Sequence, residues 1–208
     1  MSGPKLWRGQ TLQDRSSERR EQILDVGEHL LGTGGATAVT MRAVTREANL
    51  SPRYFYESFA TREELIIAIY DRLEAQLLER LLGISLDGGL RVTLREVFER
   101  FGDFFDEDPR RARILLREPL ADDTLHNHSV SRTPTFIRAV IPLLGAEAGE
   151  LAPPNDEDLA IAAAALSGAL VSIYLEYADG RLVPDRDRIA QAAVEVVFAL
   201  SSAIRTGN

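Results

Sequence analysis

The hydrophobic positions of this chain recur every three or four residues along most of its length, which is the period of amphipathic α-helices. In the first such stretch, about residues 17–31, Ile23, Val26 and Leu30 share one face, and glycines at positions 32, 34 and 35 end the pattern. Further helices are predicted over about residues 41–48, 52–59, 62–82, 90–107, 109–118, 133–148, 156–180 and 185–204. We therefore expect an all-α protein.

Residues 40–50 carry the signals of a short helix followed by a turn. Thr40 can cap the helix, because its hydroxyl can accept a hydrogen bond from the free amides of the first turn. Val44 and Ala48 then share a face. Asn49 tolerates a left-handed backbone, so we expect the chain to turn at that position.

A second short helix begins directly after the turn. Ser51 can serve as its N-cap, and Pro52 suits the first helical position. Phe55 and Phe59 are four residues apart and are expected to bury against the preceding helix. In Thr61-Arg62-Glu63-Glu64, the threonine and the last glutamate form a capping box, so a third helix is expected to begin there.

The outer side of the second short helix presents Arg53, Tyr54 and Tyr56. An arginine can form two hydrogen bonds to a guanine edge, and a tyrosine can reach a phosphate oxygen or a thymine methyl. The segment therefore predicts a DNA-binding helix-turn-helix, with an ordinary helical corner as the alternative. The candidate DNA-binding residues are Thr40, Arg42, Ser51, Pro52, Arg53, Tyr54, Tyr56, Thr61 and Arg62.

The run ANLSPRYFYESFATREELI resembles the DNA-binding signature of TetR-type regulators, and the likeness extends from about residue 20 to residue 65. The N-cap, the turn, the aromatic run and the next cap follow the order and spacing of that family. Three positions depart from its usual pattern, because Asn49 stands where glycine is usual, Arg53 where a small residue is frequent and Ser58 where histidine is frequent.

This resemblance implies three regions. Residues 1–16 would be a flexible N-terminal arm, residues 17–64 a three-helix DNA-binding domain, and residues 65–208 a helical domain that binds a ligand and dimerises. The helix from residue 62 would connect the two domains, and its tilt would set the separation of two recognition helices in a dimer. The last two helices would form the homodimer interface, although they could also be central helices of a monomer.

The net charge differs between the N-terminal part of the chain and the rest, and the difference favours DNA binding by the N-terminal part. The formal net charge is −8, yet the residues through position 65 hold nine basic and nine acidic side chains, so the whole excess lies after them. If the neutral, locally basic N-terminal part forms one end of the protein and the acidic remainder the other, the N-terminal end would face a polyanion such as DNA during approach. With no cysteine, no signal-peptide pattern and no run of about eighteen apolar residues, we expect a cytoplasmic protein without a membrane span.

The middle of the chain offers candidates for a small-molecule site. The aromatic residues between positions 98 and 105 favour core packing, with one or two of them open to a ligand-lining role. An apolar or aromatic effector is the corresponding hypothesis. The candidate ligand-binding residues are Phe101, Phe105, Arg113, Phe136, Tyr174 and Tyr177.

Metal, cofactor and catalytic chemistry find little support in the sequence. His126 and His128 lie two apart, but no carboxylate follows them at helical ligand spacing, so no metal site is predicted. No phosphate-binding glycine loop or nucleophile motif is present, and no cofactor is expected. We expect a dimeric, ligand-responsive repressor that binds double-stranded operator DNA; a helical scaffold or an all-α enzyme without a DNA role is the alternative.

Overall fold

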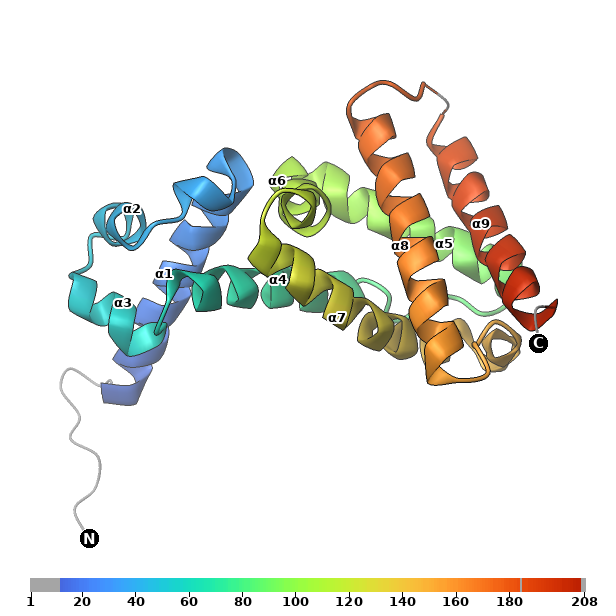
Figure 1. The fold of residues 1–208 in the computed structure, drawn as a ribbon, viewed down its shortest axis with the longest axis horizontal. Coiled ribbons are helices and arrows are strands. Elements are labelled where there is room, and N and C mark those ends of the chain that lie inside the picture. The colour runs from blue at the N-terminus through green and yellow to red at the C-terminus, as the bar shows by residue number, and fades with distance from the viewer. Residues whose placement is uncertain (1–11, 184, 207–208) are drawn as a thin grey trace, which may run out of the picture.

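The computed structural model describes residues 12–183 and 185–206, and those residues form helices without any strand, as the sequence predicts. A small head at one end is joined to a larger body by one long helix (Figure 1). The head and this helix consist of α1 (Leu12–Gly34), η1 (Ala36–Ala38), α2 (Met41–Glu47), α3 (Pro52–Ser58) and α4 (Arg62–Glu79).

The body is built from the remaining helices, with α8 and α9 side by side at the end far from the head (Figure 1). A π-helical turn, η2, lies directly between α6 and η3. The body comprises α5 (Leu90–Glu107), α6 (Pro109–Ala112), η2 (Arg113–Arg117), η3 (Glu118–Leu120), α7 (Asp123–Val140), η4 (Ile141–Leu144), η5 (Ala146–Glu150), α8 (Asp156–Ala178) and α9 (Arg186–Thr206).

Two helices begin earlier than their hydrophobic pattern indicates. α1 is already helical at Leu12, and the rest of the predicted N-terminal arm, residues 1–11, lies outside the described residues. α7 begins at Asp123 rather than near residue 133, because Asp122 caps it by accepting from the amide of Leu125 at 3.1 Å. α7 ends at Val140, and the 3-10 helix η4, which contains Pro142, follows directly, so the predicted helix over residues 133–148 is interrupted near this proline.

One apolar core runs from the head into the body along α4. Buried α4 side chains such as Leu65 and Ile69 pack in the same cluster as Phe55 of the head and Phe104 and Ile114 of the body. The predicted domain boundary between residues 64 and 65 falls in the first turn of α4. Because α4 contributes to the core on both sides of that boundary, the head and the body share one packed interior.

Charged side chains fasten the head to the body at η1. The backbone N–H of Ala36 donates to Glu118 Oε2 at 2.8 Å, and Glu118 Oε1 accepts from Arg113 Nε at 3.0 Å. Arg113 Nη1 also donates to the carbonyl of Thr33 at 2.7 Å. Gly35 has a φ of 77°, and a Cβ there would lie 2.8 Å from Glu118 Oε1, so glycine permits both the turn and the close approach.

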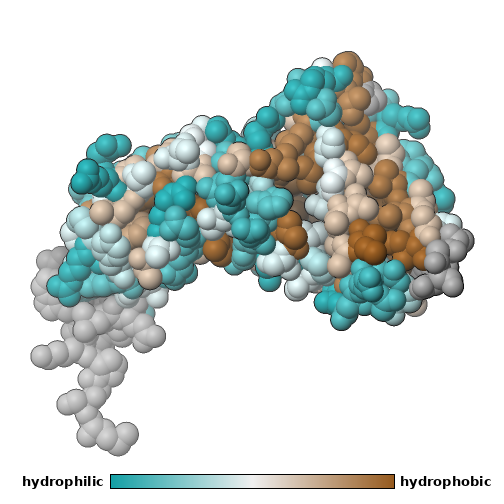
Figure 2. Space-filling view, viewed as in Figure 1, coloured by the Kyte–Doolittle hydropathy of each residue, from teal (hydrophilic) through white to brown (hydrophobic). Residues whose placement is uncertain are grey.

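The outer face of α8 is apolar but not covered by the rest of the chain. Figure 2 shows hydrophobic residues gathered over α8 and α9, whereas the visible surface of the head is mainly hydrophilic. Only 11% of the most apolar window of α8 is buried, and Ile161 is 54% exposed. By length and composition α8 could cross a membrane, which corrects the prediction that no segment qualifies; here it packs against α7 and α9.

Replacing Glu118 with alanine is expected to lower the free energy of unfolding by about 3 kcal/mol, because it leaves the Ala36 amide and the Arg113 guanidinium without their buried partner. Urea unfolding monitored by circular dichroism measures the change. The control Glu195→Ala removes an exposed ion pair with Arg91 and should cost less than about 1 kcal/mol. Equal losses of unfolding free energy in the two variants would contradict the claim that the bonds of Glu118 stabilise the junction between the head and the body.

Candidate nucleic-acid interface and cavity

The head has the local geometry of a helix-turn-helix. Thr40 caps α2, its hydroxyl accepting from the amide of Ala43 at 3.1 Å. The turn passes through Asn49 at a φ of 51°, the left-handed conformation expected from the sequence. Ser51 is the N-cap residue of α3 and Pro52 occupies its first turn, although the Ser51 hydroxyl makes no capping bond.

The apolar side of α3 is anchored in the head. Phe55 and Phe59 are each 1% exposed and pack in one cluster with Val44, while Leu50 packs against its edge. Since both phenylalanines face inward, the spacing of four residues places the remaining α3 side chains outward. The sequence prediction for this contact is confirmed.

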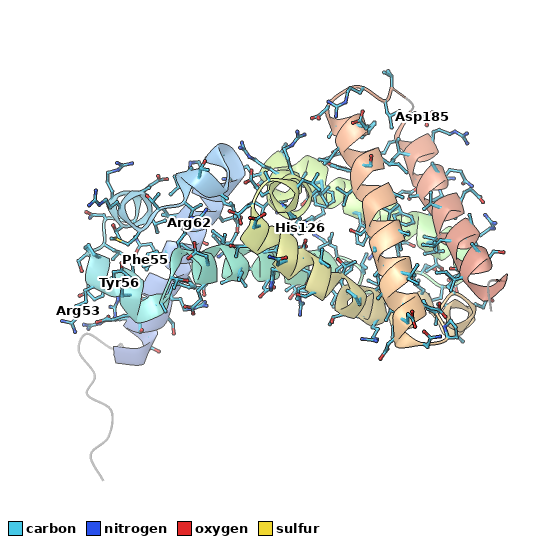
Figure 3. All side chains as sticks on the ribbon, in the orientation of Figure 1. Arg53, Phe55, Tyr56, Arg62, His126 and Asp185 are labelled. Atoms are coloured by element: carbon cyan, nitrogen blue, oxygen red, sulfur yellow. The ribbon has the colours of Figure 1, made fainter. Side chains whose placement is uncertain are left out.

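The outward side of α3 carries two open side chains. The side chain of Arg53 is 83% exposed and holds Glu57 by a 2.7 Å ion pair from Nε, which leaves its terminal nitrogens accessible. Tyr56 is 59% exposed. Both lie on the outer end of the head, away from the body (Figure 3).

Tyr54 is placed differently from its two neighbours. It is half-buried, and the guanidinium carbon of Arg19, from α1, lies 4.5 Å from the centroid of its ring. Such a cation–π contact stabilises the position of the ring on the head. No pattern in the sequence connects Arg19 with Tyr54, because residues far apart in the chain give no joint signal.

The other predicted contact residues fall into an exposed group and one exception. The exposed group comprises Thr40, Arg42, Ser51, Pro52 and Thr61. Thr61 caps α4 by accepting from the amide of Glu64 at 3.1 Å, but the returning bond of Glu64 goes to the amide of Ala60 rather than to Thr61. The predicted capping box is therefore half formed.

Arg62 is the exception, because it points to the junction between the head and the body (Figure 3). Its Nε donates to the carbonyl of Val39 at 2.8 Å, its Nη2 donates to the carbonyl of Ala36 at 2.5 Å, and its guanidinium lies 3.6 Å from Asp122. Its donors are engaged in holding η1 and the start of α7, and its role in DNA binding stays a prediction.

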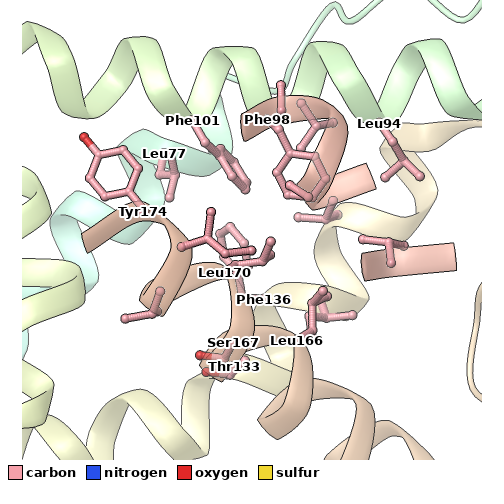
Figure 4. Close-up of a pocket in the computed structure, with 18 of the residues that line it drawn as sticks. Leu77, Leu94, Phe98, Phe101, Thr133, Phe136, Leu166, Ser167, Leu170 and Tyr174 are labelled. Carbon is pink, nitrogen blue, oxygen red and sulfur yellow. The ribbon is translucent and has the colours of Figure 1, made fainter. Parts of the chain in front are cut away.

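The body contains a partly open, apolar cavity of about 310 Å³ between α4, α5, α7, α8 and α9. Figure 4 shows aromatic and aliphatic side chains projecting into it, including Phe101, Phe136 and Leu170. The volume lies at the small end of the range typical of ligand sites. The arrangement can accept a small, mainly apolar molecule.

Five of the six predicted ligand-binding residues line this cavity. These five are Phe101, Phe105, Phe136, Tyr174 and Tyr177. Arg113 does not, because its bonds to Glu118 and Thr33 hold it at the junction with the head, and this corrects its placement. Its neighbours Leu115 and Leu116 face the cavity instead, so the π-helical turn η2 touches both sites.

The polar residues of the cavity wall were missed by the sequence analysis. Glu74 lines the cavity on α4, and Asp106 and Arg186 line it on α5 and α9. Burial raises the pKa of Glu74 even though Arg132 pairs with it. A signal for Glu74 exists in the sequence, since a carboxylate stands four residues after Tyr70 on an otherwise apolar helix face.

The two neighbouring histidines have different partners. His128 Nε2 lies 2.6 Å from Asp71 Oδ1 on α4, and His126 Nδ1 lies 3.2 Å from the carbonyl of Pro119. They therefore contribute to packing of α7 rather than converging on a shared point. Among the described residues, no group of three or more His, Asp or Glu side chains is placed to hold a metal ion.

Comparisons with known proteins agree on one family. Residues 23–69 match the family described as bacterial regulatory proteins, tetR family. The chain is 27% identical over 176 residues to the HTH-type transcriptional regulator AlkX of Mycobacterium tuberculosis, an alignment that covers 84% of this chain and 81% of the relative.

Solved structures share the fold at low sequence identity. A tetR-family transcriptional regulator from Streptomyces coelicolor superposes with a TM-score of 0.67 at 22% identity, covering 92% of this chain and 84% of that one. The multidrug binding protein EbrR, complexed with imidazole, gives a TM-score of 0.63 at 17% identity, with 94% and 97% covered.

The Arg62→Ala variant is expected to lose about 2 kcal/mol of unfolding free energy, because the carbonyls of Ala36 and Val39 lose their donor at the junction. Arg53→Ala removes an exposed arginine with an exposed ion pair, so its change should stay within about 0.5 kcal/mol. Urea unfolding of both proteins is the measurement. A destabilisation of Arg53→Ala equal to that of Arg62→Ala would refute the assignment of these two roles.

Proposed function

Because this chain belongs to the TetR family of bacterial regulatory proteins, we propose that it is a homodimeric repressor that leaves its operator when a small molecule enters the body. The observation that carries the proposal is the open outer side of α3, with Arg53 and Tyr56 exposed on a helix that is anchored from behind. The protein would act in the cytoplasm and without catalysis.

The head supplies the chemistry for operator recognition. Arg53 can read a guanine edge through its free terminal nitrogens, and Tyr56 can contact a thymine methyl or a phosphate. Arg42 and Thr40 at the start of α2, together with Thr61, would contact the phosphate backbone. The negative charge of the body, set against the neutral head, favours an approach in which α3 meets the DNA first.

A second copy of the chain is needed to cover α8 and α9. Their outward faces carry small residues at helical spacing, with Ala164, Gly168 and Ser172 exposed on α8 and Ala199 exposed on α9. Small side chains allow two helix pairs to approach closely, and a twofold interface pairs the same surface with itself. Two heads would then meet successive half-sites on one side of a duplex, about 34–36 Å apart.

Release from DNA requires that the cavity and the head communicate. Two segments connect them. α4 lines the cavity and continues into the head, and η2 carries both Leu115, on the cavity wall, and Arg113, which pairs with Glu118 at η1. A ligand that binds one arrangement of these segments better than the other would shift the population of dimers that fit the operator. The multidrug-binding relative supports a small-molecule effector.

Tyr56→Ala and Arg53→Ala are each expected to weaken operator binding about tenfold or more, because each removes a side chain that would contact a base edge. Gel shifts measure this on a duplex selected from random sequence by the wild-type protein. The control Arg138→Ala removes an arginine of α7, far from the head, and should bind like wild type. Unchanged affinity in both α3 variants would exclude α3 as the recognition helix.

Gly168→Arg is expected to convert the dimer into monomers. A Cβ at Gly168 meets no atom within 4 Å in the single chain, so the arginine fits the monomer but obstructs a paired α8. The matched control Gly149→Arg also meets no atom at its Cβ and lies in η5, outside the proposed interface. Sedimentation equilibrium gives the mass of each; a dimeric Gly168→Arg protein would place the interface elsewhere.

A further inference from the structure

A buried carboxylate on the cavity wall has one oxygen without a partner. The side chain of Glu74 is 9% exposed and lines the cavity from α4. Arg132 donates to it from both Nε, at 2.9 Å, and Nη2, and both bonds go to Oε2. Among the described residues no donor reaches Oε1, and this oxygen is not sealed inside the packing, so it can accept a hydrogen bond from a molecule in the cavity.

The surroundings of Glu74 make this oxygen a strong acceptor for a ligand. The cavity around it is mainly apolar, and burial raises the pKa of Glu74, which indicates that water does little to stabilise its charge. A hydrogen bond to an ionised group in such a place is stronger than one between neutral groups. A ligand that donates a hydrogen bond to Oε1 would give this oxygen the partner that the protein does not supply.

The remaining charged groups on the wall already have counter-ions. Glu99 pairs with Arg95 at 2.9 Å, and Arg186 pairs with Asp106 at 3.3 Å and with Asp103 at 2.6 Å. A carboxylate ligand would find no free guanidinium on this wall, and an ammonium ligand would have to share a carboxylate with an arginine. Burying an ion without its own partner is costly, so the wall favours an uncharged molecule.

We propose that the effector is a neutral, mainly apolar alcohol whose hydroxyl donates to Glu74 Oε1 while its apolar part lies among the aromatic side chains of the cavity. This deepens the proposed function, on which it rests for the identification of the cavity as the effector site. Phe101, Phe136 and Leu170 supply the apolar surface. Because Glu74 belongs to α4, the hydroxyl of the ligand would contact the same helix that continues into the head.

The test is isothermal calorimetry on the full-length protein without DNA, using four probes that each contain an unbranched chain of eight carbon atoms: octanol, methyl octyl ether, octylamine and octanoate. Octanol should bind about tenfold more tightly than the ether, which accepts but cannot donate a hydrogen bond. Octylamine and octanoate, both ionised at neutral pH, should bind more weakly than octanol. Failure of octanol to bind, or equal or tighter binding of any other probe, would overturn the proposal.

The variant Glu74→Gln tests the residue itself. Its amide oxygen would accept from Arg132 and turn the amide N–H₂ toward the cavity, so a donor replaces the acceptor. The octanol-to-ether affinity ratio should then fall about tenfold, a readout that a general loss of stability would not produce. The control Glu96→Gln removes a carboxylate paired with Arg100 outside the cavity and should keep the wild-type ratio.

These results are separable from those of operator binding. A protein that selects octanol through Glu74 but binds no selected duplex would retain this inference and refute the repressor. A protein that binds its operator but prefers the ether or the ionised probes would support the repressor and refute the inference of an alcohol effector. An unchanged octanol-to-ether ratio in folded Glu74→Gln would show that Oε1 does not recognise the hydroxyl.

Discussion

Burial of the apolar face of α4 is the constraint on which the rest of this molecule depends. Leu65, Ile66 and Ile69 complete the core of the head, and Leu73 and Leu77 continue the same face into the body. Since side chains in a close-packed interior cannot shift independently, the head cannot reorient without moving α4. The same helix also forms part of the cavity wall, so the position of the head and the shape of the cavity are physically linked.

Polar contacts complement this apolar connection at a second point. Ala36 is held through both its backbone groups, the N–H by Glu118 and the carbonyl by Arg62. Since Glu118 is buried, its bonds to Ala36 and Arg113 compensate the cost of removing a carboxylate from water. A π-helical turn adjoins this contact, and such turns often occur at functional sites, which agrees with the position of η2 between the cavity and η1.

The uncovered helices explain why one copy of the chain would be incomplete. α8 is the most apolar long helix, yet three of its small residues, Ala164, Gly168 and Ser172, face outward, where they stabilise nothing in the single chain. Pairing with a second copy would remove that surface from water and would set two heads at a fixed separation. The cavity lies beside these helices, so a dimer would hold in place the α8 and α9 side of the cavity.

The sequence by itself determined the all-α fold and the helix-turn-helix, because caps, turn residues and the Phe55–Phe59 spacing act between neighbours in the chain. It also identified five aromatic residues of the cavity wall, since aromatic stripes mark buried faces whatever covers them. Only the tertiary structure decided the roles of Arg62, Arg113 and Glu74. Long charged side chains are defined by partners from distant segments, and in this protein those partners lie at η1, η3 and α7.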